Sequence, residues 1–173
     1  MNTTNWFQFP VYFGVLLLLV KPLGAYMAHV YQGDRTFLHP VLSPVERFFY
    51  RFSGVKSEEE MNWKRYASTV LLFNLVGFLF DYLLLRVQYY LPLNPQGFGN
   101  LSPDLAFNTA VSFVSNTNWQ NYGGETTLSY LSQMLALGAQ NFLSAATGMS
   151  VLIVLIRGIS NKSSEKLGNF WVD

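Results

Sequence analysis

Three stretches of the chain are apolar for long enough to cross a membrane as helices. The first covers residues 7–20 and is extended past a lysine by 22–27, the second covers about 67–89, and the third covers about 128–156. A helix that spans a bilayer needs about 20 mainly apolar residues. The pattern therefore predicts an all-α membrane protein with three transmembrane helices.

Composition supports this class and excludes others. Of the 173 residues, 50% are hydrophobic and 12% are charged, about half the charged share of a soluble domain. The chain has no cysteine, which excludes disulfides and thiolate metal sites, and two histidines cannot build a metal cluster by themselves. The net charge of +1 argues against a nucleic-acid partner.

The basic residues predict the orientation in the membrane. Six of the eleven Lys and Arg residues lie between the first and second apolar stretches, three follow the third, and 90–156 holds none. By the positive-inside rule, residues 28–65 and 158–173 are cytoplasmic, whereas 90–127 and the N-terminus face outward. A signal peptide is the alternative for the first stretch, but residues 1–20 lack the basic residues that should precede its apolar core.

This orientation divides the chain into four parts. They are a first transmembrane helix (1–27), a cytoplasmic loop with interfacial helices (28–65), a pore repeat (66–157) and a cytoplasmic tail (158–173). In the loop, Ser43 with Glu46 and Ser57 with Glu60 have the spacing of capping boxes that begin two helices. The first of these, "PVERFFYRF", combines aromatic and basic residues as a helix at the inner membrane surface does.

The segment between the second and third helices begins and ends on the outer side, so it cannot cross the membrane fully. It contains a helical stretch, Pro103–Val114, of twelve residues, about 18 Å long and roughly half of the hydrocarbon core. Ser102 is the predicted N-cap, and Asp104 suits the positive end of the helix dipole. We expect a re-entrant pore helix; an amphipathic helix lying flat on the outer surface is the alternative.

A polar, uncharged stretch follows this half-length helix. No acidic or basic side chain occurs from Leu105 to Gly124, and the polar side chains in this stretch are neutral. Backbone carbonyls at membrane depth can replace the hydration shell of a monovalent cation, and potassium fits such neutral dipoles better than sodium or calcium. The predicted filter residues are Ser115, Asn116, Thr117 and Asn118, with Trp119, Gln120, Asn121, Gly123 and Gly124 flanking them. An ordinary polar extracellular loop is the alternative.

Other polar residues in the apolar segments have open roles. The third span carries many Ser, Gln and Asn side chains, which suits a helix facing a pore or one packed in a bundle without a pore. Asp81 and Arg86 lie inside the second span, where charged groups are candidates for function, although Arg86 can extend to the interface. Glu125 at the outer mouth could attract cations.

The chain also resembles a known family. "DLAFNTAVSFVSNTNWQNYGGETTLSYLSQM" and "QNFLSAATGMSVLIVLIR" resemble the first pore repeat of the potassium-binding A subunit of Kdp-type potassium-transporting ATPases, and "EEMNWKRY", "YYLPLNPQ", "KPLG" and "LGNFWVD" match as well. The resemblance implies a potassium-channel-like fold of helix–loop–helix repeats in the bacterial inner membrane. It also implies potassium at residues 115–118, a filter-flanking Gln120 that affects affinity, and no organic cofactor.

The resemblance further implies partners and a departure from the family. The ATP-hydrolysing P-type subunit and small accessory subunits complete such a pump, so this chain is expected to be a non-catalytic ion-binding subunit. The family chain holds four pore repeats, whereas this chain holds one, so we expect a fragment or split product that needs the remaining repeats. A non-transporting membrane scaffold or accessory subunit is the alternative function. An intramembrane enzyme is disfavoured, because no nucleophile–base pair or phosphate-binding loop is evident.

Overall fold

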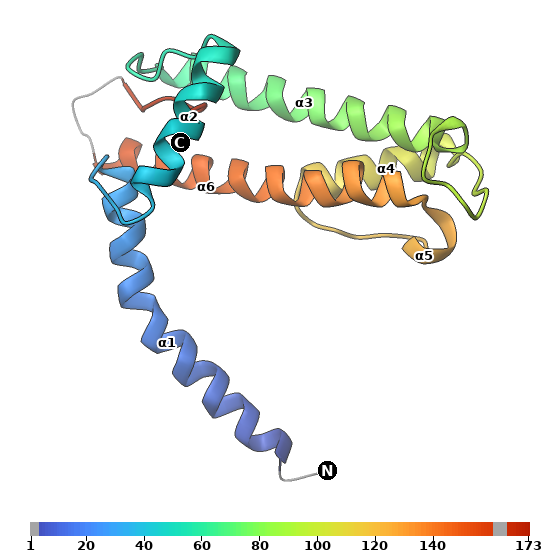
Figure 1. Ribbon diagram of the computed structural model, residues 1–173, viewed down its shortest axis with the longest axis horizontal. Coiled ribbons are helices and arrows are strands. Elements are labelled where there is room, and N and C mark those ends of the chain that lie inside the picture. The colour runs from blue at the N-terminus through green and yellow to red at the C-terminus, as the bar shows by residue number, and fades with distance from the viewer. Residues whose placement is uncertain (1–3, 161–165) are drawn as a thin grey trace. The chain divides into compact units, whose positions relative to one another are not determined.

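The computed structural model describes residues 4–160 and 166–173, which form helices and connecting loops (Figure 1). The chain divides into two units, residues 1–56 and 57–173. Three helical segments of the described chain are long and apolar enough to span a membrane: Trp6–Tyr31, Trp63–Tyr90 and Ser132–Ser160. The prediction of an all-α protein with three candidate spans is therefore confirmed.

The first unit consists of α1 (Thr4–Tyr31) and α2 (His39–Ser53). Helix α1 continues without interruption through Lys21 and Pro22, so it is longer than the strictly apolar run. Helix α2 ends where Gly54 adopts a left-handed conformation (φ 67°) and donates its N–H to the carbonyl of Tyr50, as a C-terminal glycine does.

The capping box predicted at Ser43 and Glu46 is wrong. Helix α2 begins at His39, four residues earlier, and proline in its first turn needs no intrahelical hydrogen bond there. Ser43 therefore lies inside the helix, where its hydroxyl accepts hydrogen bonds from the Arg47 guanidinium at 3.0 and 3.2 Å.

The second unit contains the helices that surround the candidate site. It comprises α3 (Trp63–Val87), the 3-10 turn η1 (Gln88–Tyr90), α4 (Pro103–Val114), the short α5 (Gly124–Thr127), the π-helix η2 (Ser132–Gly138) and α6 (Ala139–Ser160). Figure 1 shows α3 and α6 running alongside each other, with α4 packed beside both at one end. The half-length α4 is thus flanked by the two long helices.

Helix α3 begins at Trp63, so the capping box predicted at Ser57 and Glu60 is also wrong. The cap is Asn62, whose side-chain oxygen accepts the N–H of Arg65 at 2.9 Å. Met61 is held in an extended conformation, because its N–H and C=O pair with Gly168 and Leu167 of the chain's last segment. That distant pairing prevents the helix from beginning at Ser57.

Two hydrophobic clusters stabilise this unit. Near one end, Leu85, Leu101, Ala106 and Leu128 are buried together and attach α4 to α3. Near the other end, Phe170 packs against Tyr66, Phe73 and Met61. Residues 166–173 are thereby docked on α3 and α6, although the sequence predicted only a tail or connection there.

Candidate functional site

Helix α4 begins and ends as the sequence predicts. The Ser102 hydroxyl accepts the N–H of Leu105 at 3.3 Å, Pro103 occupies the first helical position, and Asp104 lies in the first turn. Ala106 and Ala110 are fully buried, so small side chains allow α4 to approach its neighbours closely.

The chain reverses direction immediately after α4, and five consecutive N–H groups point back to the helix end. The N–H of Ser115 donates to Val111 O at 2.9 Å, and that of Asn116 to Phe113 O at 3.2 Å. The N–H groups of Thr117 and Asn118 both donate to Ser112 O, at 3.0 and 3.3 Å. The N–H of Trp119 donates to Ser112 Oγ at 2.6 Å. Ser112 is 5% exposed and receives three of the five.

This hydrogen-bonding pattern fixes the direction of the carbonyl groups between these residues. In a planar trans peptide the C=O of one residue and the N–H of the next point in opposite directions. The carbonyls of Ser115, Asn116, Thr117 and Asn118 therefore all point away from the end of α4. In the described part of the chain, none of these four oxygens accepts a hydrogen bond.

Backbone conformation explains how successive carbonyls share one side. Asn116 and Asn118 have positive φ angles of 57° and 56°. Asparagine tolerates this left-handed conformation better than most residues. Left-handed residues alternating with right-handed ones make successive N–H groups converge on one side, and here they converge on Ser112.

Side chains hold the loop from two directions. The Thr117 hydroxyl donates to the Ser112 carbonyl at 3.1 Å, and the Ser115 hydroxyl donates to Val111 O at 2.8 Å. From α6, the Ser144 hydroxyl lies 3.4 Å from Asn116 Oδ1, at the limit of a hydrogen bond. The polar face of the third span thus contacts the loop.

The predicted flanking residues form the return arm of the loop. Trp119, at 82% exposed, Gln120 and Asn121 project into open space, whereas Tyr122 packs against the cluster around Leu85. Gly123 precedes α5, and the Gly124 carbonyl accepts the side-chain amide of Gln133 at 3.2 Å.

The sequence analysis missed Gln88, a polar residue at the end of α3. Its side chain is completely buried and contacts both segments that flank the hairpin formed by α4 and its loop. A glutamine directly before the aromatic and proline residues of "YYLPLNPQ" was the available signal, but its partners lie 11 to 44 residues away.

The three charged candidates are in different environments. Asp81 is 1% exposed, and neither carboxyl oxygen has a hydrogen-bond partner among the residues described. Arg86 donates to the carbonyl of Leu101, and Glu125 is exposed in α5. The described residues contain no group of three or more His, Asp or Glu side chains suited to a metal ion.

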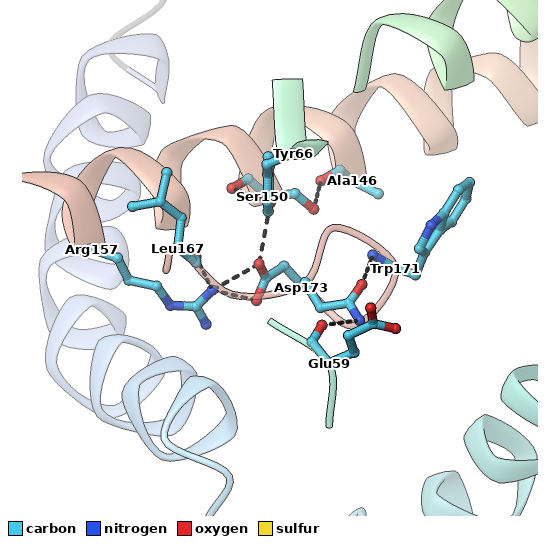
Figure 2. Close-up of polar contacts among 9 residues, drawn as sticks. Glu59, Tyr66, Ala146, Ser150, Arg157, Leu167, Trp171 and Asp173 are labelled. Atoms are coloured by element: carbon cyan, nitrogen blue, oxygen red, sulfur yellow. Dashed lines mark hydrogen bonds and ion pairs between the residues drawn. The ribbon is translucent and has the colours of Figure 1, made fainter. Parts of the chain in front are cut away.

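A second polar cluster lies at the opposite ends of α3 and α6 (Figure 2). Arg157 donates to both carboxylate oxygens of Asp173 at 2.7 Å, and to the carbonyl of Leu167 at 3.1 Å. The Tyr66 hydroxyl lies within hydrogen-bonding distance of Ser150 O (3.1 Å) and of the Asp173 carboxylate (3.2 Å). These contacts fasten the last residues of the chain to both long helices.

The fold and loop define a class: a membrane protein in which a half-length helix leads into a loop whose successive carbonyls accept no hydrogen bond from the residues that the structure describes. The model of the KdpA family, described as the potassium-transporting ATPase A subunit, matches residues 10–173. The chain belongs to this family.

Curated relatives agree with the family assignment. Potassium-transporting ATPase potassium-binding subunits of Brucella anthropi, Granulibacter bethesdensis and Sorangium cellulosum are 57%, 56% and 58% identical to this chain. Each match covers all 173 residues here and 30% of the relative. The chain therefore spans about a third of the length of these relatives.

Proposed function

We propose that residues 66–157 form one re-entrant pore repeat that binds potassium through backbone carbonyls. The observation that carries the proposal is the row of four carbonyls at 115–118, which point away from α4 and accept no hydrogen bond within the described chain. Such oxygens can take the place of the water around an ion.

The electrostatics of the loop favour a monovalent cation. The C-terminal end of a helix carries a partial negative charge, and α4 directs this end toward the loop. Residues 105–124 contain no charged side chain, so no fixed carboxylate is present to hold divalent ions strongly. The relatives are named potassium-binding subunits, which makes potassium the ion of choice.

One loop supplies a fraction of the oxygen ligands that surround an ion in a filter. Because the relatives are about three times longer than this chain, further pore repeats are expected to supply the rest. By family resemblance, a separate P-type subunit hydrolyses ATP, and small accessory subunits complete the complex. The protein is then a non-catalytic part of a potassium uptake pump.

The same proposal includes a location in the bacterial inner membrane. The distribution of Lys and Arg supports an orientation with the N-terminus and 90–127 outside, and 28–65 and 158–173 inside. Helix α4 then enters the membrane from the outer side and the return arm leaves on that side. A polar, irregular backbone at that depth is tolerated where it lines a wet cavity or is buried in protein.

A charge placed beside the loop tests the proposal. Gln120→Arg puts a cation next to the carbonyl row, and Gln96→Arg adds the same charge at an exposed position outside residues 105–124. Rubidium uptake by the complete complex should require about tenfold more ion in Gln120→Arg, from roughly 1.4 kcal/mol of repulsion. Gln96→Arg should resemble wild type. Equal behaviour of all three proteins would show that the loop does not bind the ion.

A further inference from the structure

A buried glutamine connects both ends of the re-entrant hairpin to α3. The amide nitrogen of Gln88 donates to the carbonyls of Gly99 (2.6 Å) and Thr127 (2.9 Å). Its oxygen accepts from the N–H of Ser129 (3.2 Å) and from the hydroxyl of Ser132 (3.0 Å). A primary amide has two donor hydrogens and two acceptor lone pairs, so every position of this group is used.

These partners lie on either side of the candidate filter. Gly99 precedes α4, whereas Thr127, Ser129 and Ser132 follow the return arm. Gln88, Ser129 and Ser132 are all fully buried. The network therefore fixes the outer base of the hairpin to the end of α3, without access to water that could replace its hydrogen bonds.

The return arm between the filter and this network has little hydrogen bonding of its own. For residues 120–122, no backbone N–H or C=O has a hydrogen-bond partner among residues 4–160 and 166–173. At its start, the arm is held by the bond from Trp119 N–H to Ser112 Oγ. At its other end, Tyr122 packs against the cluster around Leu85 and Gln133 binds the Gly124 carbonyl, while Gln88 holds the residues that follow through Thr127 and Ser129. The position of the Asn118 carbonyl therefore depends on both attachments.

We propose that Gln88 is a positioning residue for potassium affinity: it fixes the outer end of the return arm and so the spacing of the carbonyl row. The role rests on the proposed function, because it acts on the ion through residues 115–118. It extends that function to a buried side chain that does not touch the ion.

Replacing the amide of Gln88 with a carboxyl group of the same size distinguishes a positioning role from a role in packing alone. Gln88→Glu keeps the size of the side chain but replaces the amide nitrogen, a double donor, with an oxygen that faces the carbonyls of Gly99 and Thr127. Ser132→Ala removes the hydroxyl that donates to the Gln88 oxygen and accepts from the Ser129 hydroxyl, and it leaves the amide in place. Gln96→Glu is the matched control, because Gln96 is exposed and its side chain makes one hydrogen bond within the described residues, to the Tyr130 hydroxyl.

The experiment measures potassium-stimulated ATP hydrolysis by the complete complex and separates the half-saturating potassium concentration from the maximal rate. In Gln88→Glu we expect the half-saturating concentration to rise about tenfold or more, with the maximal rate within about twofold of wild type. Ser132→Ala should raise it by about threefold, and Gln96→Glu should leave it unchanged. Thermal unfolding of each purified complex shows whether the variants are folded.

The outcomes separate the two proposals. A wild-type complex without a potassium response would overturn the proposed function and, with it, the role of Gln88. A responsive wild type whose Gln88→Glu variant keeps the wild-type half-saturation, or loses only its maximal rate, would overturn the positioning role alone. If Gln88→Glu does not assemble, Ser132→Ala decides, and an unchanged half-saturation there would overturn the role.

Discussion

Replacing Ser112 with alanine tests whether the end of α4 holds the carbonyl row in place. The Ser112 hydroxyl accepts the N–H of Trp119 at 2.6 Å, and this N–H belongs to the same peptide group as the Asn118 carbonyl. The substitution removes this acceptor. It leaves the Ser112 carbonyl, which still receives the N–H groups of Thr117 and Asn118. The change therefore acts mainly on the last of the four carbonyls.

The expected magnitude follows from one hydrogen bond. A neutral hydrogen bond contributes about 0.5–1.5 kcal/mol, and a buried donor left without a partner costs about 1–3 kcal/mol. Since about 1.4 kcal/mol corresponds to a factor of ten, rubidium should bind about tenfold more weakly to the Ser112→Ala protein. The fold should persist, because α4 keeps its cap and its buried alanines.

Ser115→Ala is the matched control in the same loop. The Ser115 hydroxyl donates to carbonyls of α4 and accepts no backbone N–H from the residues described, so its loss leaves all five N–H contacts in place. Equilibrium binding of radioactive rubidium to the complete purified complex should therefore change by less than about twofold. Wild-type affinity in a folded Ser112→Ala complex, or an equal loss in both variants, would refute the reasoning.

Three further substitutions test other parts of the structure. Asp81→Leu removes a buried carboxyl that lacks a hydrogen bond in the described chain, and should stabilise the protein by about 1–3 kcal/mol; a lower thermal unfolding temperature in detergent would contradict this. Arg157→Gln leaves the Asp173 side chain, 5% exposed, without its guanidinium partner. The free energy of unfolding should fall by about 1–3 kcal/mol, less than for a fully buried pair, because the arginine is partly exposed. Limited proteolysis should then cut the docked segment 166–173 faster, and unchanged cutting would argue against the cluster in Figure 2. Phe48→Glu combined with Phe52→Glu removes exposed aromatic groups from α2, so trypsin should cleave this helix faster in lipid nanodiscs; equal rates would contradict an interfacial position.

Local features of the sequence predicted the elements around the loop well. The three apolar runs predicted the three spans, because a run of apolar residues is a local property of the sequence. The cap at Ser102 and the start of α4 at Pro103 were also correct, because both depend on residues that are neighbours in the chain. The filter assignment at residues 115–118 stays a prediction; among the described residues, no hydrogen bond to these four carbonyls is found.

Features that depend on distant residues could not be predicted in this way. The start of α3 shifted from Ser57 to Trp63, because residues beyond 165 pair with Met61. The docking of Phe170 on Tyr66 depends on the same distant contact. The π-helical geometry of η2, Ser132–Gly138, has no simple periodic signature, so the sequence does not predict it.

The candidate site shows the same distinction. The sequence predicted a filter at residues 115–118, but not the contacts that orient this loop. Ser112 is a single serine inside the otherwise largely apolar α4, and its role depends on how the chain turns back on this helix. Gln88 is 11 residues or more from each partner, so its network became visible only in three dimensions.

The most direct test of the central proposal is the position of a heavy alkali ion in the complete complex. Anomalous scattering from rubidium, measured on crystals of the complete complex, locates the ion without reference to any assigned residue. The account predicts a rubidium peak against the carbonyl oxygens of Ser115–Asn118, absent when sodium replaces rubidium. A rubidium peak bound only elsewhere, with the four carbonyls facing bulk solvent, would contradict it.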